Sequence, residues 1–265
     1  MSFRSLLFVP GARPERFEKA LAAGADQVCI DLEDAVPPPQ KADARAAVAD
    51  FVAGRPEFGV RINTPRTAWG AADIAAIAAI RPAFVMIPKV AHPVELDIVR
   101  EATGATRIVP IVESAEGLKN AFDICAAQGV AAVLFGGFDF AADIGCTMDW
   151  EPLLFARSTL AAACARAGVE LMDVPYLDVD DAAGLTESTK RARALGFTGR
   201  ACIHPKQVDG VKAAFAPSAE EIAHAKRVMA AFEAADGAAA LLDGKLVELP
   251  VIRASRRILA AAGEG

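Results

Sequence analysis

Apolar and polar positions follow a repeating order along this chain. Short runs rich in Val, Ile, Leu and Phe are each followed by an Ala-rich or amphipathic stretch of several helical turns. Continuous apolar runs of this kind are typical of parallel strands that helices cover on both faces. Eight such runs predict strands at residues 5–9, 27–33, 59–63, 84–89, 107–113, 131–136, 170–175 and 200–204. The stretches between them predict helices at residues 14–23, 41–52, 71–80, 93–102, 115–128, 152–167 and 180–195.

Eight strand–helix units favour closure into a barrel over an open, doubly wound sheet. We therefore expect an α/β fold, a (β/α)8 TIM barrel, over residues 1–215. Residues 216–265 exceed what a minimal barrel needs. They predict a C-terminal extension of two helices, at 219–235 and 252–262, around a hairpin within 237–250. The dipeptide Asp243-Gly244 supplies the turn of that hairpin, and the extension is expected to act as a lid and oligomer contact.

Charge and composition narrow the classes of function. The 265 residues carry a formal net charge of −6, which argues against a nucleic-acid partner because phosphate binding needs a basic face. Hydrophobic residues make up 54% of the chain, yet no apolar run approaches the roughly 20 residues that span a bilayer. The apolar run at residues 6–10 is too short for the core of a signal peptide. Five isolated cysteines indicate free thiols, so we expect a cytoplasmic protein without a membrane partner.

Polar residues gather where the predicted strands end. In barrels of this kind the active site lies at the carboxyl ends of the strands. Several carboxylates at one barrel mouth would repel one another unless a cation lay between them, and oxygen ligands with open positions suit Mg²⁺ or Mn²⁺. The strand-end residues are Asp31, Glu33, Asp34, Arg61, Asn63, Lys89, Glu113, Ser114, Gly136, Gly137, Asp139, Asp173 and His204.

Glu113 and Asp139 are the predicted metal ligands, because each follows a strand and the two strands are neighbours. The alternative for this pair is a helix N-cap or a salt bridge to Lys89 or Arg61. Glu33 and Asp34 are expected to hold metal-bound water from behind.

For several of these residues a structural role competes with a chemical one. Asp34 is also a plausible turn residue ahead of the prolines at 37–39. Arg61 leaves a buried strand and needs an anion, either Glu33 or a ligand carboxylate, and a planar guanidinium suits the ligand.

Four further strand-end residues also allow more than one role. Lys89 could bind substrate or pair with Glu113. His204 is a candidate general base, although a histidine fixed by backbone hydrogen bonds is the favoured interpretation. Gly136 and Gly137 could let backbone amides approach an anionic substrate closely.

Other enzyme classes lack their motifs. The chain has no phosphate-binding G-x-x-x-x-G-K-[ST] loop, no G-x-G-x-x-G loop and no H-E-x-x-H helix. Ser114 does not stand in the sequence context of a nucleophile elbow. Because Lys89 ends a strand, a Schiff-base aldolase is a possibility, but the carboxylates favour a metal-assisted reaction.

At these strand ends the sequence resembles the citrate lyase β-subunit-like (CitE-like) family within the HpcH/HpaI aldolase and malyl-CoA lyase group. The matching segments appear in the family order and span nearly the whole chain. They are LLFVPGARPERFEKA (6–20), IDLEDAV (30–36), VRINTP (60–65), MIPKV (86–90), IVESAEGL (111–118), LFGGFDFAADIG (134–145) and CIHPKQV (202–208), with PSAEEI (217–222) and LVELPV (246–251) in the extension.

The resemblance implies a metal-binding barrel, usually a homotrimer, that cleaves or forms 3-hydroxyacyl-CoA thioesters of the malyl-, citramalyl- or citryl-CoA type. By motif, Glu113 and Asp139 match the metal ligands and Arg61 matches the substrate-binding arginine. Glu33 and Asp34 match the acidic pair behind the metal. Mg²⁺, or Mn²⁺, would be the cofactor, with a CoA thioester and a 2-oxo acid as the small-molecule partners.

Two segments depart from the family pattern. The usual Ala-Glu before the ligand aspartate is Gly137-Phe138 here. The C-terminal aspartate that family members offer to a neighbouring subunit as acid or base is Glu248 here. Cleavage of the carbon–carbon bond would leave the thioester product as an enolate. A carboxylic acid such as Glu248 would protonate the enolate carbon while Arg61 stabilises the enolate oxygen.

Two alternatives stay open. One is a class II aldolase on free 4-hydroxy-2-oxo acids, although no histidine precedes His92 to form that class's His–Asp pair. The other is a non-catalytic binding or assembly subunit of a lyase complex.

Overall fold

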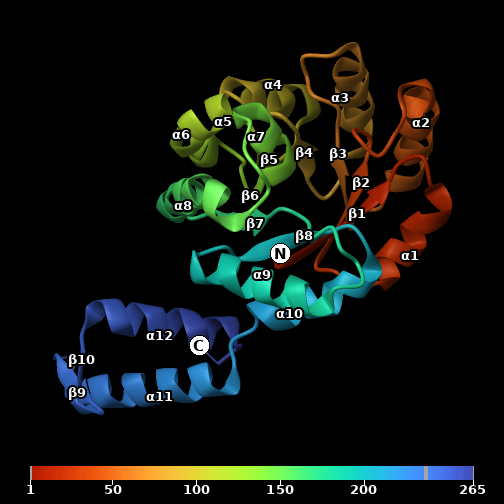
Figure 1. The fold of residues 1–265 in the computed structure, drawn as a ribbon. Coiled ribbons are helices and arrows are strands. Elements are labelled where there is room, and N and C mark those ends of the chain that lie inside the picture. The colour runs from red at the N-terminus through yellow and green to blue at the C-terminus, as the bar shows by residue number, and fades with distance from the viewer. Residues whose placement is uncertain (1, 236–237, 265) are drawn as a thin grey trace. The chain divides into compact units, whose positions relative to one another are not determined.

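The computed structural model describes residues 2–235 and 238–264. Eight parallel strands form a closed barrel in sequential order, with β1 paired to both β2 and β8 (Figure 1). The predicted (β/α)8 barrel is therefore confirmed. The strands are β1 (Ser5–Pro10), β2 (Gln27–Asp31), β3 (Phe58–Arg61), β4 (Val85–Ile87), β5 (Ile108–Val112), β6 (Ala132–Phe135), β7 (Glu170–Asp173) and β8 (Gly199–Cys202).

Most strands end one or two residues earlier than the apolar pattern predicts. Glu33, Asn63, Lys89 and Glu113 all lie beyond the last paired residue of their strands. At β2 the cause is local, because the amide of Glu33 donates to Asp31 Oδ1 at 2.8 Å and so leaves the strand ladder. These polar side chains therefore belong to the loops that follow the strands.

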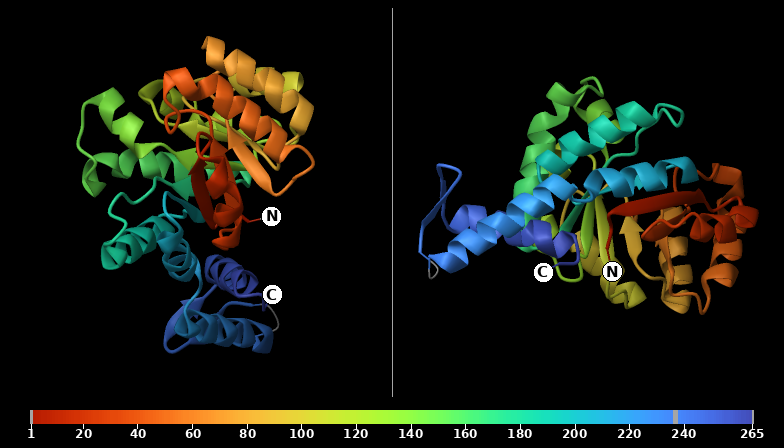
Figure 2. Two further views of the ribbon diagram at one scale, coloured as in Figure 1. Left: turned by 90° about the vertical axis from the view of Figure 1, so that its right-hand side faces the viewer. Right: turned by 90° about the horizontal axis from the view of Figure 1, so that it is seen from below.

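Helices surround the barrel, as the two views in Figure 2 show. They are η1 (Pro14–Arg16), α1 (Phe17–Ala22), η2 (Pro38–Gln40), α2 (Lys41–Val52), α3 (Ala68–Ile80), α4 (Val94–Thr103), α5 (Ala115–Lys119), α6 (Ala121–Ala126), α7 (Gly137–Ile144), α8 (Trp150–Ala167), α9 (Ala182–Ala194), η3 (Pro205–Gln207) and α10 (Val208–Phe215). Polar caps start several of them: Thr67 accepts from the amide of Gly70, and Ser114 from that of Gly117, both at 3.1 Å.

The helix prediction was wrong in two respects. The single helix expected at 115–128 is two helices, because the chain breaks at Asn120, whose Nδ2 donates to the carbonyl of Ala91 at 2.8 Å. Helices α7 and α10 were not predicted. The two glycines that open α7 hid it, since glycine disfavours a helix interior.

The barrel interior is filled by apolar side chains from most of the strands. Phe84 meets Phe3 edge to face, with 5.3 Å between ring centroids. The Phe84 ring occupies the space that a β-carbon on Gly59 would need, so the neighbouring strand requires glycine there. The cluster is Phe3, Leu6, Cys29, Phe84, Met86, Val109, Ile111, Ala132, Leu134, Met172 and Ala201.

The chain divides into two compact units. The barrel unit runs to Lys212, and the C-terminal unit begins at Ala213. In the C-terminal unit, α11 (Ala219–Ala234) packs on α12 (Leu249–Ala261), and β9 (Ala240–Leu242) pairs with β10 (Lys245–Val247).

The predicted hairpin of the C-terminal unit is confirmed. Both Asp243 (φ 52°) and Gly244 (φ 76°) are left-handed, as a two-residue turn of this type requires. Gly237, at the start of the predicted segment, lies outside the described residues. Within the described part of the chain, no helix has the length and apolar character needed to cross a membrane.

Candidate active site

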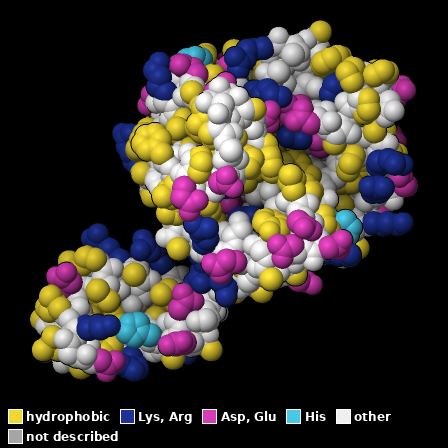
Figure 3. Space-filling view, viewed as in Figure 1, with side chains coloured by type: hydrophobic (Ala, Val, Ile, Leu, Met, Phe, Trp, Pro, Cys, Tyr) yellow, Lys and Arg dark blue, Asp and Glu magenta, His cyan; other side chains and the backbone are white. Residues whose placement is uncertain are grey.

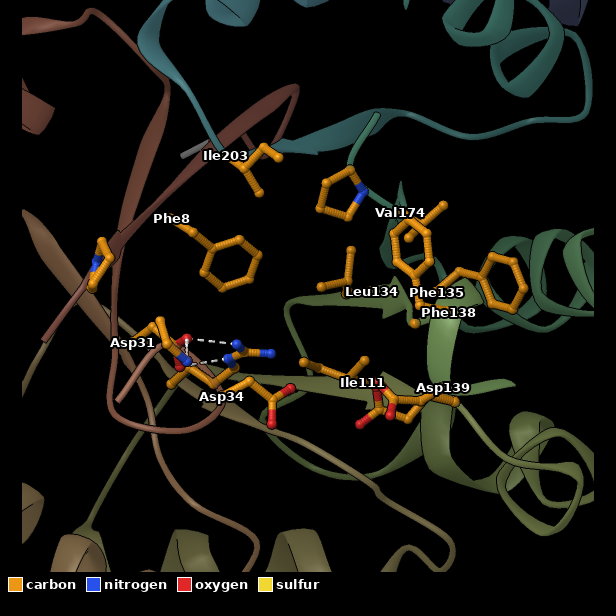
Figure 4. A pocket seen from close by; sticks show the side chains of 16 residues that line it. Phe8, Asp31, Asp34, Ile111, Leu134, Phe135, Phe138, Asp139, Val174 and Ile203 are labelled. Carbon is orange, nitrogen blue, oxygen red and sulfur yellow. Dashed lines mark hydrogen bonds and ion pairs between the residues drawn. The ribbon is translucent and has the colours of Figure 1, made fainter. Parts of the chain in front are cut away.

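A cavity of about 450 Å³ opens at the carboxyl ends of the strands, within the barrel unit. Figure 4 shows it from close by, and Figure 3 shows acidic, basic and apolar side chains lying close together near the middle of this unit. Its volume suits a small-molecule ligand. The lining residues are Phe8, Pro10, Asp31, Asp34, Ala35, Arg61, Ile111, Glu113, Leu134, Phe135, Gly136, Phe138, Asp139, Val174, Pro175 and Ile203.

Arg61, at the end of β3, is held by two carboxylates. Asp31 lies opposite it in the strand register and accepts two hydrogen bonds, from Nε at 2.7 Å and Nη2 at 2.6 Å. Arg61 Nη1 also lies 3.1 Å from Glu33 Oε2. Burial alone would lower the pKa of Arg61, but Asp31 and Glu33 raise it, so the guanidinium stays charged. Of the two anions that the sequence suggested for Arg61, the protein supplies Glu33, and it adds Asp31, which was not predicted in that role.

Lys89 joins two acidic residues through different groups. Its Nζ lies 2.7 Å from Glu33 Oε1, and its backbone amide donates to Glu113 Oε1 at 2.6 Å. Its φ of 56° lies in the left-handed region. Burial by itself would lower the pKa of Lys89, but the hydrogen bond to Glu33 raises it. A Schiff-base nucleophile must be a neutral amine, so this environment opposes that role for Lys89.

Glu113 follows β5 directly and is 6% exposed. Burial, and then the nearby charge of Asp139, raise the pKa of Glu113 to about 8. Gly136 makes room for this side chain, because a β-carbon on Gly136 would stand only 2.5 Å from the β-carbon of Glu113. The glycine at this position is therefore required by packing against Glu113.

Asp139 lies in the first turn of α7, and not at the end of β6 as the sequence suggested, because β6 stops at Phe135 and Gly136 already caps the helix. It is exposed and lines the same cavity as Glu113. Among the described residues, none of the assigned ion pairs or side-chain hydrogen bonds involves Asp139. The structure gives no support for the alternative that Asp139 is a salt-bridge partner of Lys89 or Arg61.

The pair Glu113 and Asp139 fits a divalent cation. The charge of Asp139 raises the proton affinity of Glu113, and a cation between the two carboxylates would relieve that repulsion. In the described part of the chain, no three His, Cys, Asp or Glu side chains converge as a complete ligand set. A cation held by these two carboxylates would keep open positions for water or substrate, as Mg²⁺ commonly does.

Comparison with known proteins places this geometry in a family. Residues 4–205 match the family model described as HpcH/HpaI aldolase/citrate lyase. The chain belongs to the HpcH/HpaI aldolase/citrate lyase family. The resemblance seen in the sequence is thereby confirmed.

Three relatives of this family cover nearly the whole chain. A (3S)-malyl-CoA thioesterase from Cereibacter sphaeroides is 35% identical over 98% of the chain and 94% of its own length. The mitochondrial citramalyl-CoA lyase of Rattus norvegicus is 30% identical over 98% of the chain and 86% of its own length. The crystal structure of CitE from Mycobacterium tuberculosis with magnesium, acetoacetate and coenzyme A has a TM-score of 0.89 at 35% identity, covering 98% of each chain.

Glu33 and Asp34, the acidic pair of the family pattern, have different surroundings. Glu33 is 6% exposed and is held by Arg61 and Lys89. Burial raises its pKa more than these two cations lower it. Asp34 lies in a turn, lines the cavity and has an exposed side chain, 3.9 Å from Lys89 Nζ. Asp34 therefore combines the turn position with access to the cavity.

Three other candidate residues lie elsewhere. His204 caps η3, and its Nδ1 accepts from the amide of Lys206 at 3.2 Å, which agrees with the structural interpretation. Asp173 is fully buried and pairs with Arg157 and Arg200, so it does not face the cavity. Glu248 belongs to the C-terminal unit, where it is exposed and precedes α12 without a capping hydrogen bond from its side chain.

Proposed function

We propose that this protein is a Mg²⁺-dependent carbon–carbon lyase, with Mn²⁺ as a possible substitute, that acts on a 3-hydroxyacyl-CoA thioester of the malyl-, citramalyl- or citryl-CoA type. The products would be a 2-oxo acid and an acyl-CoA. The observation that carries the proposal is the placement of Glu113 and Asp139 beside Arg61 in one strand-end cavity. The CitE structure with magnesium, acetoacetate and coenzyme A supports the same ligands for this chain.

Glu113 and Asp139 would hold the metal, and the backbone amides at Gly136 and Gly137 would approach the anionic substrate beside it. A bound Mg²⁺ would lower the pKa of the substrate hydroxyl and polarise the adjoining carboxylate. Lys89 fixes the orientation of Glu113 through its amide. Because Lys89 also holds Glu33, it is a positioning residue in this scheme as well as a candidate substrate contact.

Arg61 would bind the substrate oxygen that becomes negative as the bond breaks. In the cleavage direction the hydroxyl would pass its proton to a water molecule, the bond between the hydroxyl carbon and the thioester α-carbon would break, and the electron pair would pass to the thioester as an enolate. A guanidinium already fixed by Asp31 and Glu33 needs no rearrangement to stabilise that enolate.

The enolate carbon then needs a proton. We assign this step to Glu248 of a neighbouring copy in a homo-oligomer, a trimer by family resemblance. Leu246 and Leu249, which flank Glu248, are 55% and 60% exposed, and exposed apolar side chains of this kind often mark an interface. In a site shared between two copies, Glu248 would come from the neighbouring copy, and the interface would cover Leu246 and Leu249.

Thioester hydrolysis is a second candidate, favoured by the similarity to the (3S)-malyl-CoA thioesterase. The two reactions leave different products. A lyase gives a 2-oxo acid and an intact acyl-CoA, whereas a thioesterase gives free coenzyme A and an unbroken hydroxy acid.

One assay tests both reactions and the two alternatives left by the sequence. Purified protein with Mg²⁺ is given malyl-CoA, citramalyl-CoA or a free 4-hydroxy-2-oxo acid, and 2-oxo acid, acyl-CoA and free thiol are measured separately. Cleavage of a thioester substrate without release of thiol is expected. Release of thiol alone would establish the thioesterase. Turnover of the free 4-hydroxy-2-oxo acid would establish the class II aldolase. No turnover of any substrate would favour the non-catalytic binding subunit.

The metal ligands are tested in the same preparation. Asp139→Ala should abolish Mg²⁺ binding in calorimetry and lyase activity, while the barrel stays folded by circular dichroism. The matched control is Asp97→Ala on α4, whose exposed carboxylate pairs with Arg100. Unchanged Mg²⁺ affinity in Asp139→Ala would refute the assignment.

A further inference from the structure

The cavity has two chemically different walls. Figure 4 shows Asp31, Asp34 and Asp139 in the lower part of the view and Phe8, Val174 and Ile203 above them, with Phe138 next to Asp139. The apolar wall is built from β1, β6 and the segments after β6, β7 and β8, and its members are Phe8, Leu134, Phe138, Val174, Pro175 and Ile203. A ligand in this cavity therefore meets charge at one end and hydrocarbon at the other.

Positive charge is scarce in this cavity. Four of the described lining residues are carboxylic acids, Asp31, Asp34, Glu113 and Asp139, and Arg61 is the one cation among them. The Arg61 guanidinium already binds Asp31 through two nitrogens and Glu33 through the third. A ligand carboxylate at the metal end can be neutralised there, but a second carboxylate against the apolar wall would meet no further cation among the described residues that line this cavity.

Phe138 is the boundary of the apolar wall. With Val174 and Pro175 it lines this cavity and also a neighbouring one of about 360 Å³, which lies toward Trp150 on α8. Phe138 is half-buried, at the N-terminal turn of α7 and next to Asp139. Together with Val174 and Pro175, its side chain thus forms part of the wall between the two cavities, beside the predicted metal ligand and at the position where the family pattern has a glutamate.

We propose that the cavity selects a 2-oxo acid, and the matching 3-hydroxyacyl group, whose substituent is a short alkyl chain, with ethyl preferred to methyl or hydrogen and a second carboxylate excluded. Phe138 is the specificity-determining residue that sets the length of this chain. The inference rests on the proposed lyase function. It deepens that function by naming the substrate class within it, an alkyl-substituted monocarboxylate in place of a tricarboxylic one.

The condensation direction gives a direct measure of this selectivity. The α-carbon of acetyl-CoA loses a proton and bonds to the carbonyl carbon of the 2-oxo acid, and the carbonyl oxygen gains a proton to become the hydroxyl, so no other reactant is needed. With Mg²⁺ and acetyl-CoA, kcat/KM is measured for glyoxylate, pyruvate, 2-oxobutyrate and oxaloacetate by detecting the acyl-CoA product. Each added methylene should raise kcat/KM about tenfold, and oxaloacetate should fall roughly a hundredfold below 2-oxobutyrate because its second carboxylate is buried without a partner.

Phe138→Ala should widen the cavity toward its neighbour, which Arg157, Arg191 and Arg200 also line, and favour a longer substrate such as 2-oxohexanoate, while kcat/KM for pyruvate falls about tenfold. Phe138→Leu keeps an apolar side chain for folding and should shift the optimum less. Phe155→Ala is the matched control, because Phe155 on α8 is 74% exposed and does not line the cavity, so the substrate order should stay unchanged.

Binding is measured separately by calorimetry of each 2-oxo acid with Mg²⁺-loaded protein in the absence of acetyl-CoA. Oxaloacetate binding or reacting as well as 2-oxobutyrate would overturn the inference. An unchanged substrate order in both Phe138 variants would overturn the role of Phe138. If no 2-oxo acid condensed but the binding order held, the lyase proposal would fail and the selectivity would stand.

Discussion

The barrel contains the same cross-strand ion pair twice, with opposite surroundings. Asp31 ends β2 opposite Arg61 of β3, and Asp173 ends β7 opposite Arg200 of β8. In both pairs the arginine Nη2 lies 2.6 Å from Oδ2 of the aspartate. The first pair lines the candidate active site, whereas the second, with side chains 1% and 0% exposed, is buried in the fold.

Charge balance separates the two pairs. Around Arg61 there are two carboxylates for one guanidinium, and its side chain is 15% exposed. Around Asp173 there are two guanidiniums for one carboxylate, because Arg157 Nε lies 3.1 Å from Asp173 Oδ1 and Arg157 stacks against Trp150 at 4.6 Å. Burial, more than the repulsion from Arg157, lowers the pKa of Arg200 although Asp173 opposes it. A charged residue at a strand end is therefore no sign of a site by itself, and its neighbours and access decide its role.

The largest expected effect is on stability. Asp173→Asn would leave two buried guanidiniums without an anion and should lower the free energy of unfolding by about 3–5 kcal/mol. Asp31→Asn should lower it by only about 1–3 kcal/mol, since Glu33 still pairs with Arg61. Urea unfolding followed by tryptophan fluorescence compares the two variants. Equal losses would show that the pairs are structurally equivalent.

A change at Arg61 should act on the reaction. Arg61→Lys keeps the charge but loses the two-nitrogen contact to Asp31, and the remaining guanidinium N–H groups that could face substrate would be lost with it. It should lower kcat/KM about a hundredfold, or about 3 kcal/mol of transition-state stabilisation. Arg200→Lys is the control in the buried pair and should lower stability while kcat/KM stays within a few-fold. Near-normal activity in Arg61→Lys would make Arg61 a structural partner like Arg200.

The stability of the protein should also depend on pH through Glu113 in the candidate active site. The pKa of Glu113 is raised from 4.5 to about 8, so between these values the folded protein binds more protons than the unfolded chain. The free energy of unfolding of the metal-free protein should therefore fall as pH rises from 4.5 to 8, by on the order of 1 kcal/mol per pH unit. Glu113→Gln should remove this slope in urea titrations, whereas Glu101→Gln, exposed on α4, should keep it. A slope that survives Glu113→Gln would place the titrating group elsewhere.

The smallest expected effect is a partial recovery of activity. It tests whether the site around Asp31 and Arg61 is completed by Glu248 of a second subunit. Arg61→Ala and Glu248→Ala should each be nearly inactive, and mixing them should restore roughly a quarter of the activity if chains exchange at random and each site combines two chains. The recovery is measured after subunit exchange has been shown by mixed labelling. No recovery after exchange, or a monomer in solution, would remove Glu248 from the site.

Much of this architecture is predictable from the sequence, because eight apolar runs and their spacing determine the closed barrel. The hairpin in the C-terminal unit is likewise signalled by Asp243-Gly244, two residues that tolerate a left-handed backbone. The partner of Arg61 was missed for a physical reason. Asp31 and Glu33 are two positions apart and share a face of the chain, but only the strand register places Asp31 opposite Arg61.

The start of α7 was missed because its glycines signal a loop. Gly136 and Gly137 are present for packing against Glu113, Phe135 and Val174, and a sequence does not display that contact. Asp139 was predicted as a ligand because it follows a strand next to that of Glu113, but the structure places it in the first turn of a helix.

The left-handed backbone of Lys89 has a consequence for how this site can be mapped by mutation. Its contact with Glu113 uses an amide, which every residue except proline retains. Most substitutions at Lys89 would therefore remove the ion pair between its ammonium and Glu33, while the hydrogen bond from the backbone amide to Glu113 would stay in place. A β-branched residue would instead resist the φ of 56° and release that carboxylate. In a saturation library, glycine and asparagine should group with one another, and valine and isoleucine with proline, an order set by backbone geometry and independent of charge.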